Sequence, residues 1–129
     1  MKLSNGTRGI PAVFLLAACL VAPLVAGAQA AADAQKIYAD VAGTYEFSYE
    51  GHVLVVHFYV RDGRLYGAEA SDSGEAEIKP LDLEKLKFET TVPSSGQYYE
   101  IGFGRDETGK VSKCQLISSG IVIDGTRVK

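Results

Sequence analysis

Residues 43–67 read GTYEFSYEGHVLVVHFYVRDGRLYG and carry the clearest β-structure pattern in the chain. Within 44–50, aromatic residues alternate with polar ones, which is the period of a strand that buries one face. Residues 53–61 are rich in β-branched and aromatic side chains, which favour strands. Asp62 and Gly63 follow, a pair typical of a type I′ hairpin turn because that turn needs positive φ. The stretch therefore predicts three consecutive antiparallel strands.

The rest of the chain repeats this design of short strands separated by turn residues. Further strands are expected at 75–81, 85–92, 97–104, 111–118 and 121–128. Pro80 cannot donate a ladder hydrogen bond, so it predicts a sheet edge or a bulge. About eight strands at spacings of roughly 8–12 residues, all with short connections, favour pairing between sequence neighbours. We therefore expect an all-β fold, an antiparallel up-and-down meander that closes into a small barrel and so leaves no exposed edge.

Composition divides the chain into three expected parts: a signal peptide at 1–28, a short helix at 29–42 and the barrel domain at 43–129. The helix is expected because Ile37 and Val41 fall on one helical face, and a glycine follows to end it. A domain of about 100 residues buries enough surface for one core.

The expected signal peptide has the three regions that such segments share. Lys2 and Arg8 supply positive charge, 10–25 is apolar, and the small residues 26–28 favour cleavage before Gln29. The mature protein is then periplasmic or secreted, with no stable membrane span.

Two other interpretations of the N-terminus remain open. The apolar run could anchor the chain in a membrane, although Pro11 and Pro23 interrupt it and it is shorter than a typical span. Residues 16–19, LAAC, resemble a bacterial lipobox, which would leave Cys19 as a lipid-carrying N-terminus. Against this, the sequence stays apolar after Cys19 through residue 28.

The net charge of the chain indicates which kinds of partner it is not expected to bind, because like charges repel. The chain has a formal net charge of −3, and loss of Lys2 and Arg8 with the signal peptide would leave −5. The sequence contains no basic run or stripe. Nucleic acid is therefore not an expected partner, and an anionic membrane surface is disfavoured.

No recognised catalytic or metal-binding pattern appears in the chain. Gly-x-Ser-x-Gly and Ser-x-x-Lys are both absent from the sequence. His52 and His57 are five residues apart, so on a regular strand they face opposite sides and do not form a zinc site. Cys114 would be the only cysteine of the mature chain and is expected to be a small buried apolar residue. We expect no catalytic residue, metal ligand or cofactor, and a protein that is not an enzyme.

Tyrosines are the strongest indication of a ligand site. Alternation places Tyr45, Tyr49 and Tyr99 on inward positions. Buried phenol hydroxyls need partners, so three of them favour a partly open interior that binds a small apolar or amphipathic ligand. The alternative is that the aromatic side chains simply fill the core.

A series of short motifs resembles a known family. The motifs are GTYE at 43–46, DGRLY at 62–66, IKPL at 78–81, Phe88, IGFGRD at 101–106 and TGKV at 108–111. Together they resemble the small lipocalin-like domains appended to bacterial serine β-lactamase-like and esterase-like hydrolases. The resemblance implies a small lipocalin-like barrel with no catalytic residues to transfer. In this sequence the domain follows the expected signal peptide rather than a hydrolase.

A second class of function is also open, a protein-interaction module such as an inhibitor or an accessory subunit of an envelope enzyme. Residues 95–99, SGQYY, resemble the Ser-Gly-x-x-Tyr loop of periplasmic C-type lysozyme inhibitors. Those inhibitors carry a disulfide and a second Lys-Gly loop motif, and the mature chain with Cys114 alone cannot form an internal disulfide.

Overall fold

The computed structural model describes residues 30–71 and 74–129. The expected signal peptide at 1–28, including Cys19, lies outside the described residues. The chain divides into two compact units, Met1–Ala34 and Gln35–Lys129, and the second contains all the strands. Within 30–71 and 74–129, no helix has the length and apolar character needed to cross a membrane.

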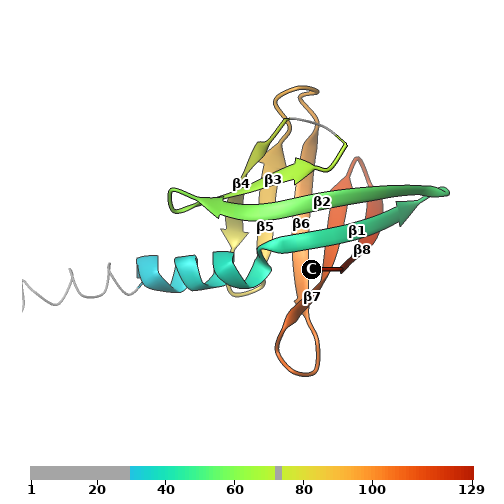
Figure 1. Ribbon diagram of the computed structural model, residues 1–129. Helices are drawn as coiled ribbons and strands as arrows, with labels where there is room; N and C mark the ends of the chain where they lie inside the picture. The colour runs from blue at the N-terminus through green and yellow to red at the C-terminus, as the bar shows by residue number, and fades with distance from the viewer. Residues whose placement is uncertain (1–29, 72–73) are drawn as a thin grey trace, which may run out of the picture. The chain divides into compact units, whose positions relative to one another are not determined.

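Eight strands form one closed antiparallel barrel in the order of the sequence, preceded by a helix at residues 30–41 (Figure 1). The strands are β1 (Gly43–Tyr49), β2 (His52–Arg61), β3 (Arg64–Glu69), β4 (Ala76–Asp82), β5 (Lys87–Thr91), β6 (Tyr98–Arg105), β7 (Val111–Ser118) and β8 (Ile121–Arg127). Each strand pairs with the next, and β8 pairs with β1. The expected all-β up-and-down meander is confirmed.

Three hairpins use two-residue turns in which both central residues have positive φ. Asp62 and Gly63 have φ of 53° and 76°, as the Asp-Gly signal predicted. The pairs at 50–51 and 119–120 adopt the same left-handed geometry and connect β1 to β2 and β7 to β8. These turns follow the right-handed twist of their strands, which lets the sheet curl towards closure.

The region of β4 and β5 departs from expectation in one detail and agrees with it in another. The strand expected at 85–92 is shorter, because Leu86 lies in the β4–β5 turn with φ of 56° and β5 starts at Lys87. Leu86 is nevertheless buried, as its place in the alternation predicted. The expected bulge at Pro80 is confirmed by a register shift between Pro80 and Asp82.

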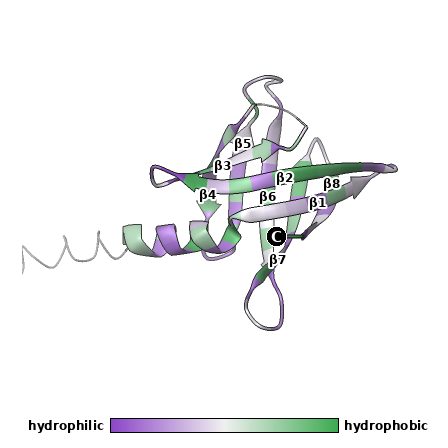
Figure 2. Cartoon of the chain, in the orientation of Figure 1, coloured by the Kyte–Doolittle hydropathy of each residue, from purple (hydrophilic) through white to green (hydrophobic). Residues whose placement is uncertain are grey.

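The core is built from inward residues of every described strand except β8, together with one residue of the helix and Leu86 of the β4–β5 turn. Its buried members are Val41, Tyr45, Phe47, Phe58, Leu65, Ile78, Leu86, Phe88, Ile101, Phe103, Val111, Cys114 and Leu116. Phe103 packs edge to face against Tyr45, Phe58 and Phe88, with ring centroids 5.1–5.6 Å apart. Figure 2 shows hydrophobic and hydrophilic residues interspersed along the strands, as expected where one face is buried.

The barrel closes where β1 meets β8 over the pairs from Tyr45–Arg127 to Phe47–Gly125. Phe47 is fully buried and lies directly over Gly125, where an added Cβ would stand 2.3 Å from the Phe47 ring. Only glycine permits this approach, so Gly125 allows the large ring to fill the space behind the seam.

Arg127 and the helix close one end of the barrel. The Arg127 guanidinium donates hydrogen bonds to the backbone carbonyls of Asp40 (3.0 Å), Ala42 (2.6 Å) and Val111 (3.2 Å). It also donates to the Lys129 carbonyl at 3.0 Å. One side chain therefore joins the end of the helix to β7 and to the C-terminus, which lies beside β1 (Figure 1).

Tyr45 belongs to the same end of the barrel. Its hydroxyl donates a 2.8 Å hydrogen bond to the Val41 carbonyl, and its ring lies beneath Arg127. Burial raises the pKa of Tyr45 to about 12, against a smaller lowering by Arg127, so the phenol stays protonated and remains a donor. Gln35 adds a 2.8 Å hydrogen bond from the helix to the carbonyl of Gly63.

Candidate ligand-binding cavity

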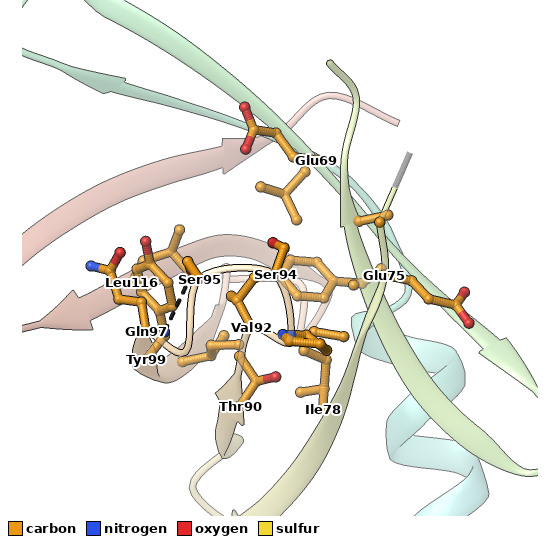
Figure 3. Close-up of a pocket in the computed structure, with 18 of the residues that line it drawn as sticks. Glu69, Glu75, Ile78, Thr90, Val92, Ser94, Ser95, Gln97, Tyr99 and Leu116 are labelled. Carbon is orange, nitrogen blue, oxygen red and sulfur yellow. Dashed lines mark hydrogen bonds between the residues drawn. The ribbon is translucent and has the colours of Figure 1, made fainter. Parts of the chain in front are cut away.

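A cavity of about 670 Å³ lies at the end of the barrel that carries the β3–β4 and β5–β6 connections, and Figure 3 shows its lining residues. Its walls come from β2 to β7 and from the β3–β4 and β5–β6 connections. The apolar lining residues are Leu54, Val56, Phe58, Ala76, Ile78, Val92, Ile101 and Leu116. This end therefore presents an apolar interior at an opening of the barrel.

The cavity exists because small residues occupy inward positions near this end. Gly67 and Ala76 are cross-strand partners, both are buried, and both face the cavity. A Cβ on Gly67 would already stand 3.1 Å from the Phe58 ring and 3.2 Å from Ile78. The ring of Phe58 packs over Gly67 and lines the cavity together with the small side chain of Ala76.

Polar groups in the cavity are few and come mainly from β5, β6 and the loop between them. Thr90 is satisfied, because its hydroxyl donates to the Glu77 carbonyl at 2.8 Å. Gln97 is engaged at the rim, donating from Nε2 to Ser118 Oγ at 3.1 Å. Among the residues that the structure describes, none forms a hydrogen bond with the half-buried Tyr99 hydroxyl. Tyr99 is thus one of the polar groups available to a bound molecule.

Of the three tyrosines expected to face inward, Tyr99 lines the cavity and the other two do not. Tyr45 is inward and fully buried, but it lies at the helix end with its hydroxyl used by Val41. Tyr49 is 38% exposed, so its inward placement was wrong. The reason is that β1 pairs with β8 only as far as Phe47, and the rest of β1 continues with β2 as a two-stranded ribbon beyond the barrel wall.

Glu75 lies at the rim of the cavity, and its carboxylate is held by hydrogen bonds from two side chains of β2. The Arg61 guanidinium donates to both carboxylate oxygens at 2.5 and 3.0 Å, and the Tyr59 hydroxyl donates to the same carboxylate. Arg61 also lies 4.3 Å from the centroid of the Tyr66 ring. The hydrogen bonds from Arg61, and then from Tyr59, hold the pKa of Glu75 below its usual range. Figure 3 shows this carboxylate pointing away from the apolar lining.

Glu69, the other rim carboxylate, was not expected from the sequence. It continues the inward alternation of Leu65 and Gly67 on β3, and it pairs across the sheet with Val56, which lines the cavity. Its carboxylate accepts a 2.7 Å hydrogen bond from Ser71, and no cationic group of the described residues pairs with it. The period-two pattern extended to residue 69 would have revealed this position.

The other side chains that could react or bind a metal ion lie outside the cavity lining. His57 is on the exposed face of β2, with Nδ1 2.8 Å from Thr44 Oγ1. Cys114 is buried as expected, and burial raises the pKa of its thiol. Within 30–71 and 74–129, no group of three or more His, Cys, Asp or Glu side chains is placed to hold a metal ion.

Comparisons of the chain with models of protein families, with curated proteins and with solved structures gave no match. The position, apolar wall and available hydroxyl of the cavity suit the binding of a small molecule, since such sites combine an apolar surface with a few oriented polar groups.

Proposed function

We propose that this protein is an exported, non-catalytic lipocalin-like barrel that binds a small apolar or amphipathic ligand. The observation that carries the proposal is the cavity of about 670 Å³, with its apolar wall and the available Tyr99 hydroxyl. This volume falls within the roughly 300–1,000 Å³ typical of small-molecule sites. An apolar body would displace water from the wall, and its polar end would bind Tyr99 near the opening.

Two further observations support parts of this proposal. The charged, apolar and small-residue regions of 1–28 support export to the periplasm or beyond. The barrel closed at one end by a helix and hollow at the other supports the lipocalin-like assignment that the ordered motifs suggested.

Titration with the neutral fluorescent probe N-phenylnaphthylamine tests the proposal. We expect saturable binding near one probe per protein. Leu54→Trp should abolish it, because the larger ring would occupy the cavity from the half-buried β2 position. Tyr99→Phe should weaken it several-fold, the effect of one lost hydrogen bond. Circular dichroism checks that each variant is folded.

Tyr49→Phe is the matched control, since it removes the same hydroxyl from a tyrosine outside the cavity lining. We expect it to leave probe affinity unchanged. Absence of saturable binding by the folded protein, or equal binding by Leu54→Trp, would contradict a ligand site in this cavity.

Exposed apolar side chains support a second candidate, a protein-interaction module acting on an envelope enzyme. The β1–β2 ribbon exposes Val53 (63%), and the β7–β8 hairpin exposes Val122 (50%) and Ile121 (44%). Large exposed apolar groups of this kind mark protein contacts when they gather in a patch.

A photo-reactive residue in place of Val53 tests this candidate in intact cells. We expect a discrete cross-linked adduct, and none when the same residue replaces Lys113 on β7. Adducts of equal yield from both positions would show that the ribbon has no dedicated partner.

A further inference from the structure

Basic side chains gather at the helix end of the barrel. The turns and strand ends there carry Arg61, Arg64, Lys85, Lys87, Arg105, Lys110, Arg127 and Lys129. At the open end, the described residues of the β1–β2, β3–β4, β5–β6 and β7–β8 connections include no Lys or Arg. None of the residues lining the cavity is cationic either. The guanidinium of Arg61 reaches the rim, but it is held there by its ion pair with Glu75.

The two charged residues that line the cavity are both carboxylates, and they differ in how they are neutralised. Glu75 is paired with Arg61, and its charge is offset on the outer surface. Glu69 has only the neutral Ser71 hydroxyl as a partner and continues the inward alternation of β3. Glu69 is thus the uncompensated charge at the opening.

We propose that the ligand of this cavity is a cationic amphiphile, with its apolar chain in the barrel and its ammonium group at Glu69. This inference rests on the proposed ligand-binding function and specifies the chemistry of the polar end. A carboxylate ligand would instead be repelled by the charge of Glu69.

Three ligands that share one alkyl chain separate the effect of the polar end from that of the apolar body. Dodecylamine, dodecanol and dodecanoate would displace N-phenylnaphthylamine from the full mature protein at pH 8, below their aggregation concentrations. We expect affinity to fall in that order. The amine should bind roughly tenfold more tightly than the carboxylate, since two opposite charge effects of the size seen at exposed sites add together. The difference should shrink as salt is added.

Substitutions at residue 69 assign the preference to one carboxylate. Glu69→Gln should bring the three affinities within about twofold of one another, and Glu69→Lys should place dodecanoate first. Glu46→Gln is the matched control, because it removes the same charge from the exposed face of β1, outside the cavity lining. It should preserve the wild-type order.

The outcomes distinguish this inference from the function on which it rests. If the probe binds but dodecanoate equals or exceeds dodecylamine, the cationic preference is overturned and the ligand site stands. The same holds if Glu69→Gln leaves the order intact. If neither the probe nor any of the three ligands binds the folded protein, the inference and the proposed function fall together.

Discussion

Phe88→Ala is expected to lower the free energy of unfolding by about 3–5 kcal/mol, the cost of a large buried truncation. Phe88 is fully buried on β5. Its ring meets Phe103 edge to face at 5.6 Å between centroids, and Tyr38 of the helix at 6.3 Å. Removal of the Phe88 ring would leave a void between the sheet and the helix. The strands of the closed barrel are paired on both sides and cannot move in to fill it.

Chemical denaturation measures this loss in the free energy of unfolding, with one m-value fitted to the wild type and the variant. His57→Ala is the comparison, because His57 is exposed on β2 and makes one hydrogen-bonding contact, with Thr44. It should cost about 1 kcal/mol or less. A larger loss for His57→Ala than for Phe88→Ala would contradict the division of inner and outer faces described above.

Arg127→Met is expected to cost about 2–4 kcal/mol, because it leaves partly buried carbonyls without donors. Methionine keeps an apolar stem of similar length, so the loss reports on the guanidinium rather than on packing. The affected acceptors lie at the end of the helix, at Asp40 and Ala42, and on β7 at Val111. The helix should therefore loosen first, which faster hydrogen exchange at the Ala42 amide would report.

Two other substitutions isolate the role of Arg127. Arg127→Lys should recover only part of the loss, since an ammonium group cannot reach several carbonyls in the planar geometry of a guanidinium. Arg64→Met should have little effect, because Arg64 is exposed and its ion pair with Glu77 is 3.7 Å long. Equal destabilisation by Arg64→Met and Arg127→Met would contradict a specific role for the carbonyl contacts.

Local sequence chemistry was enough to predict the ladder of strands. Alternation placed Phe47, Phe58 and Phe88 inward correctly, and Asp62-Gly63 predicted its hairpin geometry. Pro80 predicted a sheet edge or a bulge because it lacks a donor, and a register shift lies between Pro80 and Asp82. These features depend on neighbours a few residues away, so a single sequence contains the information.

The candidate site was predictable only in part, because it depends on where distant strands begin and end their pairing. Tyr49 follows the alternation of Tyr45, yet it lies beyond the last β1–β8 pair and is exposed. Glu69 was not singled out from the sequence, although it keeps the inward phase of β3 and lines the cavity. Arg127 has the inward phase of Gly125, but two of its acceptors, the carbonyls of Asp40 and Ala42, are more than eighty residues away in the sequence. Such pairings follow from ring closure rather than from local pattern.

The seam of three residue pairs between β1 and β8 joins segments about eighty residues apart. The conformational entropy lost on closing a flexible loop rises only with the logarithm of its length, about 0.6 kcal/mol for each doubling. About ten extra residues in a connection at the open end lengthen the loop closed by the seam by much less than a doubling. The free-energy cost of closing the barrel would therefore rise by only a small fraction of about 0.6 kcal/mol. The connections at 70–75 and 92–97, which border the cavity, are thus free to vary in length while the barrel stays shut. A chain of this design can acquire a new specificity by remodelling its opening, with the seam and the helix end left as they are.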